Sequence, residues 1–392
     1  MSRVRELEPP RFHPEAWARH GPPPLEVSTP VARDAAPADQ AALLDLATAC
    51  PMVGDFTLCV DRTPDFFALN RLEGGSWRCG VVDGPAGAPV GCIAVSERRA
   101  YLDGGPVRTI YVGDLKVHPA HRGGAVADAL TRYARDVALA TGGPDVPTLL
   151  TVLAGNRAME RRAAGPRGLP ALARFATIRS HAVPLLWRRR QRPELDVATG
   201  DLRDLGEMAA LWRRLSPARN FAPVYTPDSL AGWIQAAPGL ALDCYRLARR
   251  RDGRLAGFLG LWDQAAFKQL RVLRYSRRAR AVRSLFNGVA PLCGAASLPS
   301  AGSPLRYVTA VHVCAEDPVV LRALLLHAYD ALRGRGYAFF TIGLDTRDPL
   351  AEALTGLLAQ PTDVHAYVTT PAGRYAGAPL DRRPLHYEIA LV

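Results

Sequence analysis

The chain has 392 residues, of which 48% are hydrophobic and 22% are charged, and 49 Lys and Arg against 37 Asp and Glu give it a net charge of +12. No run approaches the roughly 18 consecutive apolar residues that a membrane span requires, so the sequence excludes a membrane-spanning helix. The length is sufficient for two domains, each with a core of its own.

The positive charge and the cysteines narrow the class of protein further. Arg greatly outnumbers Lys, and the charge favours an anionic partner: a phosphorylated cofactor, nucleic acid, an acidic carrier protein or an anionic membrane. Solubility alone is the plain alternative. Seven widely spaced cysteines without a C-x-x-C pair argue against both a disulfide framework and a zinc site, so we expect no metal. The first residues lack the apolar core of a signal peptide, and we expect a cytoplasmic protein.

The first half begins with an arm and continues as a folded domain. Residues 1–24 are rich in Pro, Arg and Glu, and we expect them to be disordered. Residues 25–187 have the pattern of an α/β domain. Its predicted elements are a helix at 41–49, strands at 78–82, 90–96 and 107–117, a helix at about 127–138, a strand at 148–153 and a helical stretch toward residue 175.

Residues 188–194 form a basic, proline-containing run that we interpret as a linker. The same order of elements then returns over residues 195–392: a helix at 204–215, a hairpin at 245–262, a strand at 307–313, a helix at 319–332 and a strand at 338–344. The strand ends at Val117 and Val313 lie 196 positions apart. We therefore predict an α/β (α+β) fold made of two tandem domains, each a mixed, mostly antiparallel sheet flanked by helices, the second copy being degenerate.

One segment has the features of an anion site. A strand ends near Val117, a proline follows at 119, and the small-residue turn Arg122-Gly-Gly-Ala-Val-Ala127 begins a helix. Small residues let backbone N–H groups approach an anion, and the helix N-terminus adds a partial positive charge. The turn suits a pyrophosphate, although it is neither a P-loop nor a GxGxxG motif. The alternative is an ordinary turn whose glycines serve only packing.

The stretch Leu115-Lys-Val-His-Pro-Ala-His-Arg-Gly-Gly-Ala-Val-Ala127 resembles motif A of the GCN5-related N-acetyltransferase (GNAT) superfamily. Arg122 and Ala127 match that motif, whereas Ala125 stands where the family has its central glycine. Asn156 stands where such proteins often place an Asn near the pantetheine arm. The resemblance covers about residues 25–187 and implies that acetyl-CoA or another acyl-CoA is bound by Leu115, Val117, Arg122, Gly123, Gly124, Ala125, Val126, Ala127 and Asn156.

The resemblance implies an N-acyltransferase that moves an acyl group from coenzyme A to a small-molecule or peptide amine by direct attack. A backbone N–H of Leu115 or Val117 would stabilise the carbonyl oxygen. We predict Asp114 as the base, acting directly or through a water, with Tyr111 as a partner. Strand alternation places these two on opposite faces unless a β-bulge intervenes. A solvated strand carboxylate is the alternative for Asp114.

Other positions are less informative. The Tyr that the family often uses as general acid is replaced by Ala163, and His118 and His121 are more typical of loop residues.

In the second half, Glu316 and Asp317 stand where the first half has its basic turn. Because two acids would repel a phosphate, we expect that half not to bind coenzyme A but to shape the acceptor cleft. His365, His386 and Tyr387 could line that cleft, and the Arg-rich stretch 271–283 is either a surface for an anionic partner or a solvated amphipathic helix.

Two other functions fit the same residues. The acyl donor could be an acidic acyl carrier protein or an aminoacyl-tRNA, since tandem domains of this kind with carrier-borne donors are known. Alternatively, the protein could be a non-catalytic acyl-CoA sensor, a reading that the alanines at 125 and 163 support. Beyond the tRNA alternative, we do not expect nucleic acid as a partner.

Overall fold

The computed structural model describes residues 29–164, 172–186, 195–373 and 380–391. The expected arm at 1–24 and the expected linker at 188–194 lie outside these residues. In the part of the chain that the structure describes, no helix is long and apolar enough to cross a membrane.

Among the described residues, each half supplies seven strands and a set of helices. The first half forms β1 (Ala32–Asp34), α1 (Gln40–Ala49), β2 (Phe56–Asp61), β3 (Ser76–Asp83), β4 (Pro89–Leu102), β5 (Gly105–Val117), α2 (Ala125–Gly142), β6 (Thr148–Leu153), α3 (Arg157–Ala164) and β7 (Ala173–Pro184). The second half forms β8 (Asp196–Thr199), α4 (Leu205–Leu215), α5 (Pro227–Ala236), β9 (Tyr245–Arg249), β10 (Leu255–Trp262), β11 (Gln269–Tyr275), α6 (Arg277–Val289), β12 (Tyr307–Ala315), α7 (Pro318–Leu332), β13 (Phe339–Asp345) and β14 (Gln360–Thr369).

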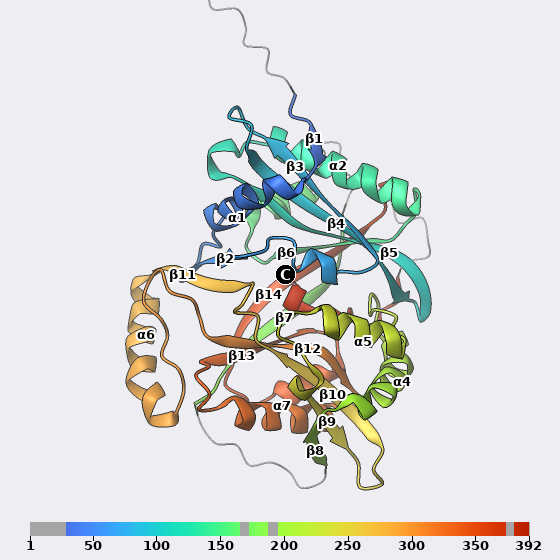
Figure 1. The fold of residues 1–392 in the computed structure, drawn as a ribbon, viewed down its shortest axis with the longest axis vertical. Coiled ribbons are helices and arrows are strands. Elements are labelled where there is room, and N and C mark those ends of the chain that lie inside the picture. The colour runs from blue at the N-terminus through green and yellow to red at the C-terminus, as the bar shows by residue number, and fades with distance from the viewer. Residues whose placement is uncertain (1–28, 165–171, 187–194, 374–379, 392) are drawn as a thin grey trace, which may run out of the picture.

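Twelve of these strands form one continuous, mostly antiparallel sheet in the order β1-β3-β4-β5-β6-β14-β7-β13-β12-β10-β9-β8. The two halves exchange strands at its centre, because β14 lies between β6 and β7, and β7 in turn pairs with β13. A second sheet joins the halves again: β2 pairs with β11. The predicted tandem fold is confirmed, with its two sheets merged into one (Figure 1).

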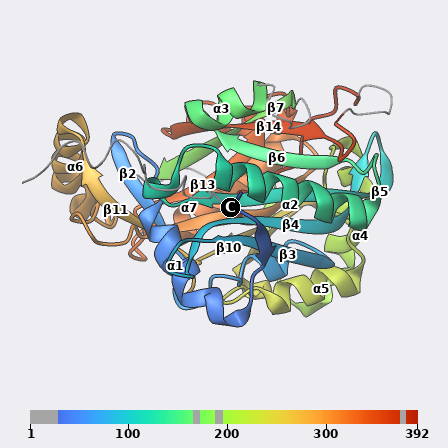
Figure 2. The ribbon, with the colours of Figure 1, turned by 90° about the horizontal axis from the view of Figure 1, so that it is seen from above.

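Helices cover both faces of the sheet in each half. Buried side chains on one face of β3, β4 and β5 pack against α2, and those on the other face, such as Cys79 and Val81, pack against α1. In the second half α7 covers one face, and α4 and α5 cover the other. Figure 2 shows α1 and α2 on different sides of the strands of the first half. The strands alternate between two buried faces, which explains their nearly continuous hydrophobic sequences.

The predicted elements are present, except that the helical stretch expected toward residue 175 corresponds to α3 and residues 173–175 belong to β7; several other elements were not predicted. The helix expected at 41–49 and the strands expected at 107–117, 148–153 and 338–344 correspond to α1, β5, β6 and β13. β2, β7, α5, β11 and β14 were not predicted. The Arg-rich stretch 271–283, for which we considered a single helix, begins as a strand: β11 ends at Tyr275 and α6 starts at Arg277.

Candidate active site

A β-bulge interrupts β5 at the residues that the sequence singled out. Lys116 pairs with Cys92 and Gly113 pairs with Ala94, so two residues of β5 face one residue of β4. Asp114 lies in the bulge with a φ of 54°, a left-handed conformation that Asp adopts more readily than most residues. The bulge required to bring positions of opposite parity to one site is therefore present.

Beyond the bulge, β5 separates from its parallel neighbour β6. The two strands pair at Ile110, Tyr111 and Val112 and at no later residue of β5. The N–H of His118 donates to the Val90 carbonyl on β4 (2.8 Å), and successive N–H groups along a strand point to opposite sides. The N–H groups of Leu115 and Val117 therefore face the gap between β5 and β6. All five residues from Gly113 to Val117 are partly exposed.

The predicted anion turn lies directly after this strand. Gly123 and Gly124 have φ values of 150° and 119°, which residues other than glycine rarely adopt. Gly124 is the N-cap of the 18-residue helix α2. Ala125, Val126 and Ala127 form its first turn. The Arg122 side chain is exposed, and its Nε donates to the Val117 carbonyl (3.3 Å). The strand end, the turn and the helix start thus meet at one place, as a pyrophosphate site requires.

The carboxylate of Asp114 is held by two cations. It forms ion pairs with Arg62 and with Lys116, each at 2.6 Å, and the Arg62 side chain is 2% exposed. Burial opposes the ionised form of Asp114, but the two cations outweigh it and hold the pKa of this carboxyl far below its usual value. Asp114 is therefore ionised at every physiological pH and is a weakly basic carboxylate.

Tyr111 belongs to a different network. Its hydroxyl bonds Thr151 of β6 (3.0 Å), which in turn bonds the hydroxyl of Tyr387 (2.9 Å). Arg98 lies over the Tyr111 ring at 4.9 Å. Burial raises the pKa of Tyr111 well above 10 and that of Tyr387 to about 12, so both phenols are protonated at neutral pH. The structure links Tyr111 to the chain of hydroxyls that crosses from β5 to β6.

Asn156 and Ala163 lie at either end of the short helix α3. Asn156 is exposed, and its Oδ1 accepts from the Met159 N–H (3.3 Å), so the side chain caps α3. Ala163 is 6% exposed and packs against Val152 and Tyr367. His118 and His121 are partly exposed in the turn, where His118 accepts from the Ala120 N–H.

The second half contains the same bulge with different contents. Phe258 pairs with Cys314 and Gly260 pairs with Val311, and His312 has a φ of 52°. Asp114 and His312 thus correspond, 198 positions apart rather than the 196 expected from the sequence. The His312 ring is buried among aromatic rings and bonds the hydroxyls of Tyr245 (2.7 Å) and Tyr225 (3.3 Å). Burial lowers the pKa of His312 to about 3, so the ring is neutral.

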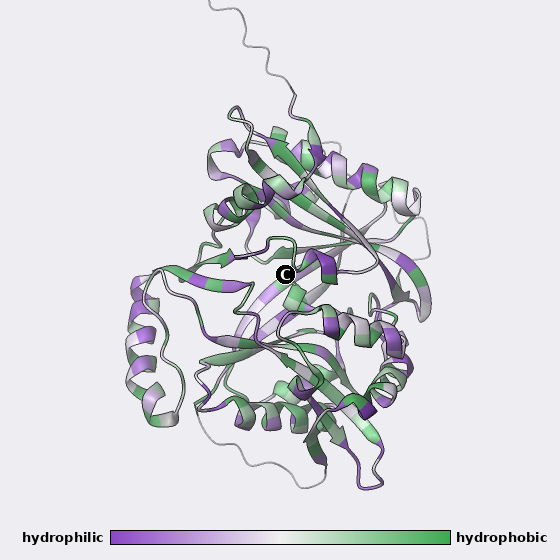
Figure 3. Ribbon diagram, viewed as in Figure 1, coloured by the Kyte–Doolittle hydropathy of each residue, from purple (hydrophilic) through white to green (hydrophobic). Residues whose placement is uncertain are grey.

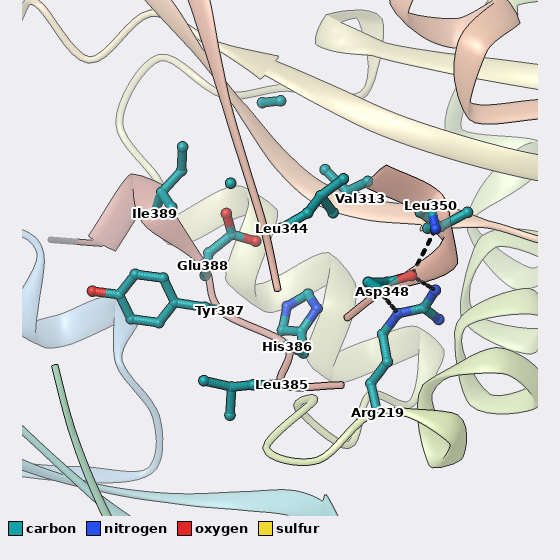
Figure 4. Close-up of a pocket in the computed structure, with 12 residues that line it drawn as sticks. Arg219, Val313, Leu344, Asp348, Leu350, Leu385, His386, Tyr387, Glu388 and Ile389 are labelled. Atoms are coloured by element: carbon teal, nitrogen blue, oxygen red, sulfur yellow. Dashed lines mark hydrogen bonds and ion pairs between the residues drawn. The ribbon is translucent and has the colours of Figure 1, made fainter. Parts of the chain in front are cut away.

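The segment 385–391 fills the gap between β12 and β13. Figure 4 shows Glu388, Ile389 and His386 of this segment around a small pocket, beside the ion pair of Arg219 with Asp348. A Glu388 oxygen accepts from the backbone N–H of His312 (2.9 Å). Ile389 lies so close to Gly343 of β13 that no Cβ would fit there. Burial raises the pKa of Glu388 to about 8.

Carboxylates of the protein itself occupy the N-terminus of α7. Glu316 pairs with Arg214, Arg250 and Arg254, and these cations lower its pKa to about 2. Asp317 caps the helix by accepting from the Val320 N–H (2.9 Å). Only these two residues separate β12 from α7, so the glycine turn of the first half has no counterpart.

The sequence analysis missed several residues that the structure brings to the two bulges. Arg62 follows β2, an unpredicted strand, and nothing in the local sequence distinguishes it from other arginines. Glu388 lies outside any periodic element, and Thr151 is an ordinary strand residue. Tyr387 and His386 were considered as cleft residues: the Tyr387 hydroxyl bonds Thr151, whereas the His386 ring packs against Trp212 in the second half. No group of His, Cys, Asp and Glu among the described residues is arranged to hold a metal ion.

Comparison with known proteins identifies the fold. No protein-family model matches the sequence, and no curated protein matches it. In structure, the chain resembles Saccharomyces cerevisiae N-myristoyltransferase with bound myristoyl-CoA, with a TM-score of 0.60 at 13% identity over 98% of this chain and 94% of that chain. It also resembles a GCN5-related N-acetyltransferase from Sphaerobacter thermophilus (TM-score 0.54, 14% identity, 88% and 96% covered) and one from Anabaena variabilis (0.51, 12%, 87% and 72%). The fold is that of tandem GNAT-like domains.

Proposed function

We propose that the protein is an acyl-CoA-dependent N-acyltransferase that binds its donor in the first half only. The observation that supports this most directly is the partly exposed gap beyond the bulge of β5, next to a glycine turn that caps an 18-residue helix. The structural neighbours are named as N-acyltransferases and N-acetyltransferases, and one of them holds myristoyl-CoA. The same fold there accommodates a donor of this class.

In this proposal the pyrophosphate lies on the N–H groups from Gly123 to Ala127, with Arg122 beside it. The pantetheine arm passes between β5 and β6, toward Asn156 and the start of α3. The thioester oxygen accepts from the N–H of Leu115 or Val117, which points into the gap. These donors are fixed by the sheet, so they need no reorganisation when charge develops on that oxygen.

The amine must lose a proton as it attacks the thioester carbon. Asp114 is too weakly basic to keep that proton, so we assign it the task of positioning a water through which the proton passes to solvent. The ion pairs with Arg62 and Lys116 hold the Asp114 carboxylate in one orientation for this task. As the carbon–sulfur bond breaks, the thiolate takes up a proton. The protonated hydroxyls of Tyr111 and Tyr387, linked through Thr151, are the donors on the β6 side.

A melting experiment followed by an activity assay tests the proposal. The protein is melted with acetyl-CoA, a long-chain acyl-CoA, free coenzyme A and, as a control, 3′,5′-adenosine bisphosphate. We expect the acyl-CoA compounds to raise the melting temperature. When a mixture of amines is added, we expect the free thiol of coenzyme A to be released. No stabilisation by any coenzyme A compound would refute the donor. Stabilisation without turnover on any amine or peptide would favour the sensor function instead.

A further inference from the structure

The segment 269–293, called here the β11–α6 arm, has an unusual surface composition. It consists of β11, α6 and the turn Ala290–Cys293. The arm lies at the edge of the molecule, on the side away from α4 and α5 (Figure 1). From Gln264 to Ala315 the sequence contains no Asp or Glu, although six arginines lie between positions 271 and 283. The arm therefore contains positive charges and no acidic residue of its own to neutralise them.

Most of these arginines are not neutralised by neighbouring elements. Arg271 pairs with Asp61 of β2, and Asp55 accepts from Ser276 at the start of α6. Arg283 is turned inward, where it donates to the Pro299 carbonyl and lies over the Tyr275 ring. The four others are exposed, and none of them has an ion pair with a described residue: Arg274, Arg277, Arg278 and Arg280.

The same arm exposes large apolar side chains. Leu292 is 86% exposed, Leu285 74%, Val282 48% and Leu273 41%. On α6, positions 278, 282, 285 and 289 recur at helical spacing and share one flank, next to the inner face on which Ala279 is buried. Figure 3 shows hydrophilic and hydrophobic bands alternating along α6. Scattered exposed leucines are ordinary, but here Val282 and Leu285 share their flank with the unpaired Arg278.

The inner face holds the helix firmly in place. Asn287 exchanges hydrogen bonds with the backbone of Leu298 (2.7 and 2.9 Å), and Phe286 packs against Leu186 and Ala290. Because the arm is anchored there, its outer flank does not need the exposed leucines for folding. A partner that fits this flank must accept both arginines and apolar side chains.

We propose that the β11–α6 arm docks the protein on an anionic lipid surface. Arginines reach lipid phosphates while leucine side chains enter the boundary between headgroups and acyl chains, the arrangement by which basic amphipathic helices bind bilayers. A nucleic acid would use the arginines but gives exposed leucines nothing to bury against. An acidic carrier protein would offer carboxylates and is distinguished by the experiment. This inference is independent of the proposed acyl transfer.

The experiment is sedimentation of the full chain with vesicles of phosphatidylcholine alone or with a third of phosphatidylglycerol. Wild type should bind the anionic vesicles and not the neutral ones. Replacing Arg277, Arg278 and Arg280 together by alanine should weaken binding on the order of a hundredfold, because each basic residue near such a surface contributes roughly a fivefold factor. The matched control removes three exposed arginines elsewhere, Arg132, Arg213 and Arg251, and should retain most of the binding.

A second pair of variants tests the apolar contribution. The double variant L285S/L292S keeps every charge and should weaken binding to anionic vesicles about tenfold or more. The control L202S/L358S changes two exposed leucines of the body and should bind like wild type. All variants alter exposed side chains, and their melting curves should match that of wild type.

Three results would overturn the proposal. Equal losses in the arm and control arginine variants would show adsorption by overall charge. Full binding by L285S/L292S would show that no side chain enters the lipid. Absence of vesicle binding together with arm-dependent capture by an acidic acyl carrier protein would assign the surface to that partner.

Discussion

The two bulges of the sheet share one backbone and differ in what occupies them. Asp114 and His312 both have a left-handed φ near 50°, at the same place in their strands, 198 positions apart. The residues around Asp114 are partly exposed and lead to a glycine turn. Those around His312 are mostly buried, and an oxygen of the Glu388 carboxyl group accepts from the N–H at the bulge. The backbone feature alone therefore does not make a ligand site.

Two changes account for the difference. A seven-residue turn separates β5 from α2, whereas two acidic residues separate β12 from α7. The segment 385–391 occupies the second gap with side chains of its own, so a pantetheine arm would have to displace Glu388 and Ile389. The predictions below test whether the first bulge alone serves chemistry and the second serves stability.

The largest expected effect is at the first bulge. Asp114→Asn keeps a side chain that tolerates the left-handed backbone but removes the charge. Turnover with an acyl-CoA and an active amine should fall on the order of a hundredfold. Since the change also leaves Arg62 without its partner, the double variant D114N/K116M restores the local charge balance; it should recover stability and remain slow in the same assay.

The corresponding change at the second bulge should separate the two roles. His312→Asn removes the bond to Tyr245 and leaves a cavity among the aromatic rings, which should cost about 2–4 kcal/mol of unfolding free energy. Turnover per folded molecule should stay within a few-fold of wild type. Equal loss of turnover at both bulges would contradict the comparison.

Glu316 gives a prediction with a pH signature. Because three arginines depress its folded pKa to about 2 from 4.5, this carboxylate stabilises the fold above about pH 4.5, and the contribution is lost as pH falls toward 2. Glu316→Gln should lower the unfolding free energy at pH 7 by about 2–3 kcal/mol, and Glu352→Gln, an exposed control, should not.

The same Glu316 variant tests how many donors the protein binds. In a calorimetric titration, wild type and Glu316→Gln should both bind one coenzyme A per chain with affinities within twofold of each other. Two sites per chain would show that the second half retains a functional anion site.

Substituting a glycine of the turn at 123–127 should weaken coenzyme A binding, whereas substituting a glycine elsewhere should not. Gly124→Glu imposes a side chain at a φ of 119° and adds a negative charge, and it should weaken coenzyme A binding by about 2 kcal/mol, nearly thirtyfold. Gly253→Glu places the same residue at a φ of 83° in the turn between β9 and β10 and should leave the affinity unchanged. Equal affinities for both variants in calorimetry would refute the assignment of the turn.

The smallest effect concerns Glu388. Its folded pKa is raised from 4.5 to about 8, so the folded state holds a proton more tightly, and stability falls as pH rises from about 4.5 to 8. Glu388→Gln removes this dependence. The variant should be more stable than wild type by about 1–2 kcal/mol at pH 8.5, and the difference should shrink toward pH 5 in denaturant titrations. A constant difference across that range would show that the carboxyl is not buried as described.

The sequence allowed the local elements and the small-residue turn to be predicted, since both depend on neighbouring residues. Alternating apolar residues defined β5 and β13, and the small residues at 123–127 defined the turn. The exchange of β7 and β14 depends on pairing between residues about 200 positions apart, which periodicity does not encode. For the same reason Arg62 was missed, because its role arises only where β2 ends opposite the bulge.

The pKa values of the predicted residues were likewise outside the reach of the sequence. Asp114 was expected to be a base, but its basicity depends on Arg62 and Lys116, and only the fold brings Arg62 to it. Tyr111 was expected to be its partner, whereas its hydroxyl bonds Thr151 and, through it, Tyr387, a residue from the far end of the chain. Burial and distant charges, rather than residue type, determine these properties.

The strand exchange also has a consequence for biosynthesis. β6 forms one wall of the proposed donor gap, and its outer edge is covered by residues 364–369 of β14. More than two hundred residues must be synthesised after β6 before β14 is complete and that edge can pair. A ribosome adds about 5–20 residues per second. The nascent first half therefore spends on the order of ten seconds or more with this edge of β6 unpaired, and an unpaired strand edge is a binding site for chaperones.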